Sequence, residues 1–214
     1  MSYLLHLDSS SIGTASISRQ VANSFLDAWT GEVVHRDLAA SPVPHLSAAG
    51  VSARVTDPAE HTAEQAEAAA VQDELIAEFL GASAYLFTVP LYNRTMPSVF
   101  KAWLDQVIVD GRTTSRSGEA PAAGRPALVI SARGGGYGPG APNHGKDFLV
   151  PTLECVLADP TLFGLDVSFL TPELTMAPMV PAISHLVPLH EASLAEAHEQ
   201  ARLRAEKITQ QLAA

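Results

Sequence analysis

A serine-rich segment near the N-terminus carries the residue types best suited to binding chemistry. Residues 7–18 read Leu-Asp-Ser-Ser-Ser-Ile-Gly-Thr-Ala-Ser-Ile-Ser, with five serines and one threonine. Hydroxyl groups beside the free N–H groups at a helix start suit a bound phosphate. No lysine or arginine precedes Arg19, so dipoles rather than cations would balance the anion. Two interpretations stay open: a phosphate-monoester site, or a serine-rich surface turn that caps a helix.

Two later segments have an unusual composition. Residues 90–93 read Pro-Leu-Tyr-Asn, residues 133–137 read Arg-Gly-Gly-Gly-Tyr, and each segment follows an apolar run. Consecutive glycines let the backbone approach a ligand without Cβ clashes. A glycine-rich surface turn is the alternative interpretation of the second segment.

Other catalytic patterns are missing from the sequence or conflict with their neighbours. No Gly-x-Ser-x-Gly turn occurs, which argues against a serine hydrolase. The eight histidines lack the spacing of a metal centre, so we expect no metal site. Gly136, Gly138 and Ala141 match a dinucleotide-binding pattern, but Pro139 and Pro142 prevent the helix that this pattern needs.

The single cysteine and the late histidines are expected to have no chemical role. Cys155 excludes an intrachain disulfide and lies in an apolar helical pattern, so we expect a buried core residue. His185 and His190 lie in a proline-rich stretch and are expected on a surface loop. His144 follows the glycine segment, where a solvated loop position is expected.

Composition indicates one globular domain over residues 1–214. Hydrophobic residues make up 47% of the chain and charged residues 17%, which is typical of a folded protein with a sizeable core. The formal net charge is −10 and no basic stripe occurs, which argues against nucleic-acid binding. No apolar run is long enough to cross a bilayer and no cationic leader is present, so we expect a cytoplasmic protein.

Hydrophobic periodicity predicts five strands that alternate with five helices. The strands are expected at 3–7, 33–38, 84–89, 126–131 and 166–170. The helices are expected at 17–29, 62–81, 97–108, 148–157 and 194–212. Gly31 would end the first helix, and Thr62 with Gln65 would form a capping box at the start of the second. Residues 41–60 are expected to form a long loop.

This alternation predicts an α/β fold with a parallel sheet covered by helices on both faces. Ligands of such sheets bind at the carboxyl ends of the strands. Three segments with unusual composition fall at that edge, at 9–18, 90–97 and 132–140. Their coincidence at one edge is stronger evidence for a site than any one segment.

The chain resembles the FMN-dependent NADH:azoreductase and quinone reductase family. The matching segments span most of the chain, at 7–10, 16–18, 36–38, 90–93, 101–105, 111–113 and 133–137. The resemblance implies a flavodoxin-like three-layer sandwich with strand order 2-1-3-4-5. It also implies FMN as cofactor, NADH or NADPH as electron donor, and a homodimer with the FMN near the subunit interface.

The resemblance also implies roles for individual residues. The FMN phosphate would be held by Ser10, Ser16, Ile17 and Ser18. The isoalloxazine ring would lie between two groups of residues, namely Leu91, Tyr92, Asn93 and Arg94 on one side and Ala132, Arg133, Gly134 and Gly135 on the other. No catalytic side chain is required, because the flavin N5 carries the hydride. Asn93, Arg94 and Tyr137 are the candidates for lining the ring.

Two departures from the family pattern affect the expected acceptor pocket. Arg94 stands where the family usually has an apolar residue, and residues 114–118 (Thr-Ser-Arg-Ser-Gly) replace the usual aromatic side chains. We hypothesise that Arg94 favours the anionic reduced flavin, raises its potential and biases the acceptor toward anionic or phenolate-bearing compounds. In the alternative, Arg94 points to solvent.

The resemblance implies a two-electron reduction of quinones or azo compounds by a ping-pong mechanism. A tailoring reductase that acts on one metabolite is an alternative within the same scaffold. Two others are a flavin-binding protein without turnover and a module that binds another phosphate ester or nucleotide. The sequence does not determine the natural acceptor or the choice between NADH and NADPH.

Overall fold

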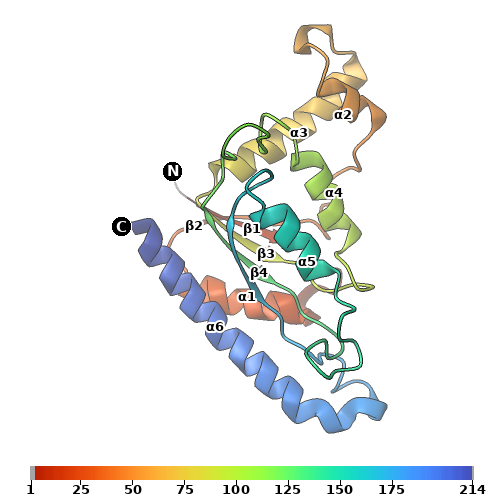
Figure 1. The fold of residues 1–214 in the computed structure, drawn as a ribbon, viewed down its shortest axis with the longest axis vertical. Helices are drawn as coiled ribbons and strands as arrows, with labels where there is room; N and C mark the ends of the chain where they lie inside the picture. The colour runs from red at the N-terminus through yellow and green to blue at the C-terminus, as the bar shows by residue number, and fades with distance from the viewer. Residues whose placement is uncertain (1–2, 214) are drawn as a thin grey trace.

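The computed structural model describes residues 3–213, and a five-stranded parallel sheet forms its centre (Figure 1). The strands are β1 (Tyr3–Asp8), β2 (Glu32–Asp37), β3 (Ala84–Thr88), β4 (Pro126–Ile130) and β5 (Asp166–Leu170). Their order is β2-β1-β3-β4-β5, and all four neighbouring pairs are parallel. The predicted α/β class and strand order are confirmed.

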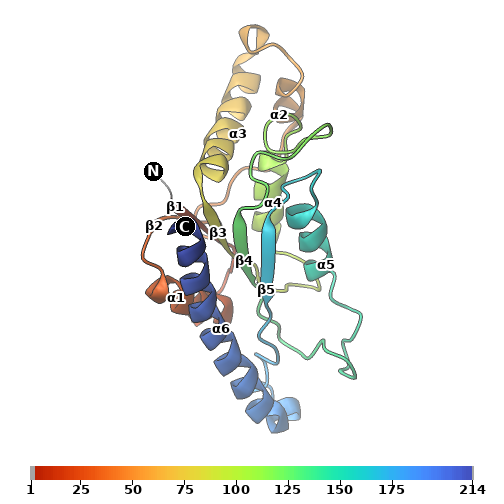
Figure 2. The same cartoon turned by 60° about the vertical axis from the view of Figure 1, so that its left-hand side comes forward.

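Helices cover both faces of the sheet (Figure 2). One face carries α1 (Ile17–Ala28) and α6 (Val187–Ala213), which pack against each other. The other carries α3 (Ala63–Gly81), α4 (Ser98–Val107) and the short α5 (Leu149–Leu153). Side chains alternate between these cores along β1: Leu4 joins the core under α1 and α6, and Leu5 and Leu7 join the opposite core.

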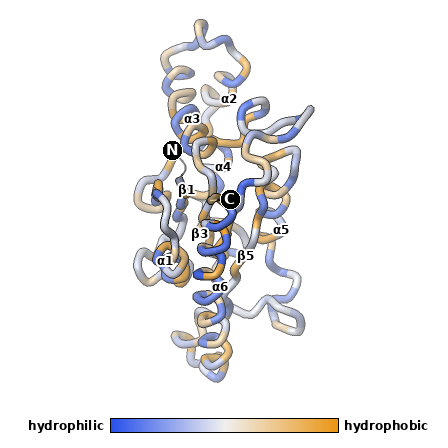
Figure 3. The backbone as a smooth tube through the Cα atoms, turned by 90° about the vertical axis from the view of Figure 1, so that its left-hand side faces the viewer, coloured by the Kyte–Doolittle hydropathy of each residue, from blue (hydrophilic) through white to orange (hydrophobic). Residues whose placement is uncertain are grey.

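Hydroxyl side chains define the starts of two helices as the sequence predicts. The Ser16 Oγ accepts a hydrogen bond from the Arg19 amide at 3.3 Å and so caps α1. At α3, Thr62 and Gln65 form the expected capping box, with reciprocal bonds of 3.2 and 2.9 Å. Figure 3 shows hydrophilic and hydrophobic stretches alternating along α6, whose buried side includes Ala197, Ala201, Ala205 and Ile208.

The predicted stop of α1 and the predicted long loop are both corrected by the structure. Helix α1 ends at Ala28, because Trp29 already has an extended backbone (φ −81°, ψ 133°), so Gly31 does not terminate it. Residues 41–60 contain α2 (Ala48–Ala53) and a 3₁₀ turn (Pro58–Glu60). Ser47 caps α2 by accepting from the Gly50 amide, and the helix packs on α3.

Cys155 and His190 also differ from expectation. A π-helical turn (Glu154–Ala158) follows α5 and directs Leu157 inward, so Cys155 is exposed rather than buried. Helix α6 starts at Val187, seven residues before the expected start, and His190 is therefore a buried helical residue rather than a loop residue. The His190 Nδ1 lies 3.2 Å from the Glu173 carbonyl oxygen.

No helix within residues 3–213 combines the length and the apolar character needed to cross a membrane.

Candidate functional site

Three loops meet at the carboxyl edge of the sheet, as the sequence predicts. The ladder of backbone hydrogen bonds continues past the strand ends, from Ser9 to Thr88, from Val89 to Ile130 and from Leu91 to Ala132, at 2.9–3.1 Å. These bonds fix the loops after β1, β3 and β4 side by side.

Side chains tie the same three loops together. The hydroxyl groups of Ser10 and Tyr92 lie 3.2 Å apart, and the Tyr92 oxygen also accepts from the Ser11 amide at 3.2 Å. The Ser18 Oγ accepts from the Ala132 amide at 3.1 Å. The loop after β1 therefore contacts both other loops.

The start of α1 presents free donors in the serine loop. The first intrahelical bond runs from the Gln20 amide to the Ser16 carbonyl, so the amides of Ile17 and Ser18 precede the helical ladder. Ser10, Ser16 and Ser18 are buried at this point of the loop. Amides, hydroxyl groups and the positive end of the helix dipole together form a site suited to an anion.

The nearest cation, Arg19, is engaged on the inner side of this loop. Its Nη1 lies 2.8 Å from the Asp37 Oδ2 and 3.0 Å from the Asp8 Oδ2, and its Nη2 donates to the Ser10 carbonyl at 2.8 Å. The hydrogen bond from Arg19 lowers the pKa of Asp37, whereas burial raises the pKa of Asp8. Arg19 therefore braces the loop, and the free donors at the start of α1 are hydroxyl and amide dipoles rather than cations.

A tight turn after β3 places Asn93 and Arg94 at the rim. Tyr92 and Thr95 exchange two backbone hydrogen bonds of 2.9 Å, and the residues between them have positive φ angles of 50° and 71°. This pattern is typical of a type I′ turn, which usually contains glycine or asparagine. Asn93 and Arg94 are exposed, and Arg94 forms no ion pair within residues 3–213.

The glycine loop after β4 is held by the segment that follows β5. The carbonyls of Gly134 and Gly135 accept from the Met176 and Leu174 amides at 3.2 Å. A Cβ on Gly134 would lie 2.9 Å from the Met176 Cγ, and one on Gly135 would lie 2.6 Å from the Asn143 Nδ2. Close packing therefore favours glycine most strongly at 134, because the end of the Asn143 side chain can move away from a Cβ at 135. In the described structure the amides of both glycines have no protein acceptor.

The Arg133 side chain belongs to the support of this loop. It is buried, with its Nη2 2.6 Å from the Asp147 Oδ2 and its guanidinium 5.6 Å from the centre of the Tyr137 ring. Glu173 holds the next turn by accepting from the Tyr137 amide at 3.0 Å. The Arg133 guanidinium is therefore engaged in supporting the loop.

The sequence does not predict which residues, after β5 and before α5, enclose the three loops. Glu173, Leu174 and Met176 bind the glycine loop, and the Phe148 amide donates to the Arg94 carbonyl at 3.1 Å. Phe148 is 57% exposed and adds an aromatic side chain beside the turn at 92–95. Nothing in their local sequence marks these residues. Glu173, Leu174 and Met176 reach the site through the parallel pairing of β4 and β5, and Phe148 reaches it where the chain enters α5.

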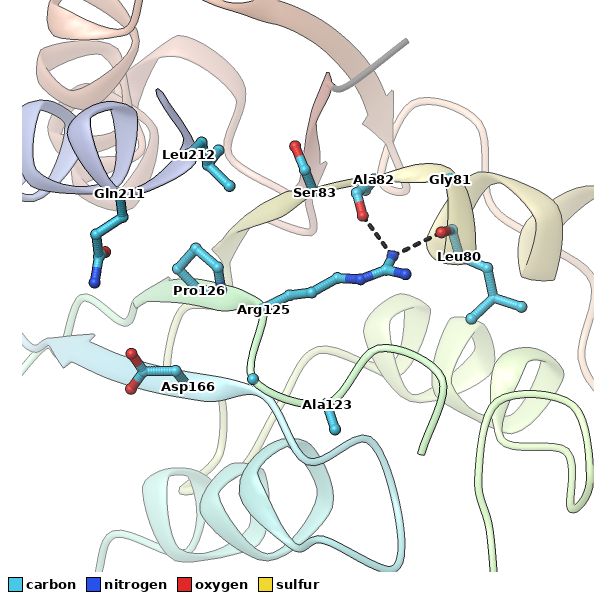
Figure 4. Close-up of a pocket in the computed structure, with 11 residues that line it drawn as sticks. Leu80, Gly81, Ala82, Ser83, Ala123, Arg125, Pro126, Asp166, Gln211 and Leu212 are labelled. Carbon is cyan, nitrogen blue, oxygen red and sulfur yellow. Dashed lines mark hydrogen bonds between the residues drawn. The ribbon is translucent and has the colours of Figure 1, made fainter. Parts of the chain in front are cut away.

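A separate cavity of about 660 Å³ lies at the opposite, amino-terminal edge of the sheet (Figure 4). Its only arginine, Arg125, donates to the carbonyl oxygens of Leu80 and Ala82 at 2.6 and 2.5 Å. This side chain serves the packing of α3 against β4, and among the described lining residues no other cation faces the cavity.

Comparison with known proteins agrees with this geometry. A family model described as a flavodoxin-like fold matches residues 2–164. The FMN-dependent NADH:quinone oxidoreductase of Streptomyces avermitilis is 46% identical, with all of both chains covered. The chain belongs to the family of FMN-dependent NADH:quinone oxidoreductases, which has the flavodoxin-like fold. A protein with the same name from Frankia casuarinae is 45% identical over 96% of this chain and 99% of its own.

Solved structures of azoreductases share the fold. An azoreductase from Bacillus anthracis has a TM-score of 0.81 at 22% identity, covering 97% of this chain and all of its own. An FMN-dependent NADH-azoreductase from the same species, solved in complex with FMN, has a TM-score of 0.80 at 19% identity over 98% of this chain and all of its own. At these identities the likeness bears on the fold alone.

Proposed function

We propose that the protein is an FMN-dependent oxidoreductase that uses NADH or NADPH to reduce quinones, azo compounds or both by two electrons. The observation that carries this proposal is the joining of the serine loop, the turn at 92–95 and the glycine loop at one edge of the sheet. The names of the full-length relatives support the same activity.

The serine loop fits the phosphate of FMN. The phosphate would be held through hydroxyl and amide donors of Ser10, Ser16, Ile17 and Ser18. Arg19 would not be the main partner of the phosphate, because its guanidinium is already paired. The geometry suits a monoester that is bound and not attacked. Asp8 and Asp37 lie behind the loop and are screened from the anion by Arg19.

The other two loops would hold the ring of FMN. Leu91, Tyr92, Asn93 and Arg94 would lie along one edge, and Ala132, Arg133, Gly134 and Gly135 would face the ring through their backbone. When bound, FMN accepts a hydride at N5 and passes two electrons to the acceptor. The free amides of Gly134 and Gly135 would donate hydrogen bonds toward the negative charge that develops on the reduced ring. Tyr137, held by Glu173, would cover the outer side.

The proposed assembly is a homodimer with the FMN near the subunit interface. Three apolar side chains lie exposed near the glycine loop and the turn at 92–95: Phe148, Met176 and Met179, with exposures of 57%, 41% and 67%. A second subunit would cover these side chains and exclude water from the ring. Residues 1–214 would form a single FMN-binding domain, and a cytoplasmic location remains the prediction from sequence.

A tailoring reductase for one metabolite is the second candidate. Arg94 favours it, because it makes the rim of the expected acceptor pocket more polar than the family pattern. Residues 114–118 do not reach that rim within one chain, because they connect α4 to the amino-terminal end of β4, where the Ser115 amide donates to the Thr161 carbonyl at 3.4 Å. Arg94 is fixed at the rim by the turn at 92–95 and has no competing ion pair within the described residues.

Steady-state kinetics test the activity and its mechanism. In a ping-pong cycle the donor and the acceptor use one ring surface in turn, so double-reciprocal plots for NADH at several quinone concentrations will be parallel. Intersecting lines would contradict the ping-pong mechanism. Uniformly low kcat/KM across a panel of quinones and azo dyes would favour the tailoring reductase instead.

A further inference from the structure

A second polar cluster lies behind the serine loop, between the edge of the sheet and α1. It consists of His6 and Asp8 on β1 and His35 on β2. The parallel register pairs His6 with His35. Leu4, His6 and Asp8 alternate on one face of β1, and Leu4 packs under α1 and α6. The same three polar residues line a cleft of about 420 Å³ with Arg19 and Asn23 from α1.

The donor atoms of this cluster converge. One ring nitrogen from each histidine and one carboxylate oxygen of Asp8 all lie within 4.8 Å of one another, and the His35 Nε2 is 3.9 Å from the Asp8 Oδ2. The two imidazole rings stack with centres 4.7 Å apart. This arrangement places two nitrogen donors and one oxygen donor close enough to bind one ion after a small adjustment.

His6 also carries a buried nitrogen that no group of the described protein satisfies. Its side chain is only 5% exposed, and its Nε2 is buried without a hydrogen-bond partner. An unsatisfied buried polar atom costs about 1–3 kcal/mol, and such atoms are rare in folded proteins. The ring is held in place by the sheet and by the stacked His35, so it cannot turn out to solvent.

We propose that His6, Asp8 and His35 bind a divalent transition-metal ion of the zinc class. Two imidazoles and a carboxylate form a donor set typical of Zn²⁺, and water from the cleft would complete four ligands. With metal–ligand bonds near 2.0–2.1 Å, tetrahedral donors lie about 3.3 Å apart. His35, whose side chain is 47% exposed, can make the small rotation that closes the present separations.

The charges around the cluster favour a cation over an anion. Asp8 and Asp37 contribute two negative charges and Arg19 one positive charge, so the group carries a net charge of −1 with neutral histidines. The guanidinium of Arg19 is already engaged by both carboxylates and by the Ser10 carbonyl. Thr88 donates to the other oxygen of Asp8 and so orients the carboxylate, as outer partners do at metal sites.

Linear sequence does not reveal this cluster, and the expectation of no metal site came from that spacing. His6 and Asp8 are separated by one residue, but His35 follows 29 positions after His6 and meets it only through the parallel pairing of β1 and β2. The proposal stands independently of flavin chemistry, because none of the three residues belongs to the expected ring-binding or phosphate-binding set.

Metal titration of the flavin-loaded, chelator-treated protein tests the proposal without measuring turnover. Zn²⁺ binding is followed by competition with a chromophoric chelator, and Co²⁺ binding by its visible absorption. We expect one Zn²⁺ per chain and binding at least about tenfold weaker in His35→Ala, since a ligand is lost. His35 is half-exposed on the edge strand, so this variant should fold.

Two further variants identify the ligand. His45→Ala removes an exposed histidine outside the cluster and should bind Zn²⁺ as the wild type does. His35→Cys should restore binding through a thiolate and add a sulfur-to-Co²⁺ charge-transfer band that the wild type lacks. Absence of stoichiometric binding, or equal binding by His35→Ala and the wild type, would overturn the proposal.

Discussion

At the scale of single residues, Ser16 has two functions that a variant can separate. Its Oγ accepts the Arg19 amide and caps α1, while its hydroxyl proton remains available for a phosphate. Ser16→Ala should lose about 1 kcal/mol of stability from the cap. It should also weaken FMN binding roughly 10- to 100-fold, because a hydrogen bond to a charged group contributes about 1.5–3 kcal/mol. Thermal unfolding and fluorescence titration with FMN measure the two effects.

Ser16→Asp is the matched control for these two functions. Aspartate caps a helix as well as serine does, so the melting temperature should stay near the wild-type value. Its negative charge repels a phosphate, so FMN binding should weaken further. Wild-type affinity for FMN in Ser16→Asp would exclude this serine from the phosphate site.

Arg94 is the residue whose role the sequence left most open. A cation at the ring edge stabilises the anionic reduced flavin, so Arg94→Phe should lower the midpoint potential of bound FMN. Arg94→Lys keeps the charge and should retain most of the wild-type potential. Reductive titration against a reference dye measures these potentials and shows whether Arg94 lies at the flavin or points to solvent. Equal potentials in Arg94→Phe and the wild type would mean that the side chain faces solvent.

Individual site residues were predictable where local chemistry marks them. Ser10, Ser16 and Ser18 stood out through their hydroxyl groups beside a helix start, and the structure places them there. The left-handed backbone of Arg94 was not predictable, because arginine rarely occupies such a turn. The burial of Arg133 depends on Asp147, which lies far from it in sequence.

At the scale of elements, the central strands were predictable because each is a short apolar run between turn residues. The helix α2 was missed because its six residues carry little periodicity and depend on tertiary contacts. The Gln72 side chain of α3 donates to the Gly50 carbonyl within it at 3.1 Å. The start of α6 was missed because Pro188 suggested a loop, although proline is tolerated in a first helical turn.

The packing of α1 against α6 should depend on pH through His198. Its Nδ1 lies 2.7 Å from the Ser24 Oγ, and burial lowers the pKa of His198 below its usual value of 6.5. As the pH falls, the unfolded chain takes up a proton on this histidine before the folded chain does. The stability that neutral His198 contributes is therefore present above pH 6.5 and is lost as the pH falls below that value. His198→Gln should therefore show a smaller drop in melting temperature between pH 7.5 and about pH 5 than the wild type.

The control for this pH effect is His45→Gln, which alters an exposed loop histidine. It should retain the wild-type pH slope. Burial also lowers the pKa of His6, to about 3, and this residue is unchanged in both variants. The difference between each variant and the wild type thus isolates one histidine, and identical slopes for His198→Gln and the wild type would refute the assignment.

At the scale of the whole molecule, exposed apolar side chains predict self-association. Met179→Glu places a charge in the proposed interface and should shift the protein from a dimer to a 22.6 kDa monomer in analytical ultracentrifugation. Val55→Glu is the control, because Val55 is 89% exposed beside α2 and away from the site. A dimer that persists in Met179→Glu would place the interface elsewhere.

The arrangement of the whole chain was largely predictable, and its completed site was not. Alternating strands and helices require a parallel sheet, and the rule that ligands bind at its carboxyl edge located the three loops. The enclosing contacts from Phe148 and Met176 depend on how the last third of the chain folds back over the edge. Contacts between segments far apart in sequence, rather than local pattern, decide this enclosure.

The visible spectrum of the purified protein tests whether it binds FMN and reduces it with a nicotinamide. The protein is loaded with FMN, freed of excess flavin and then treated with NADH in the absence of oxygen. We expect a retained flavin absorption band that bleaches on addition of NADH, or of NADPH if that is the donor. A protein that retains no flavin, or a bound flavin that neither nicotinamide reduces, would contradict the proposed function.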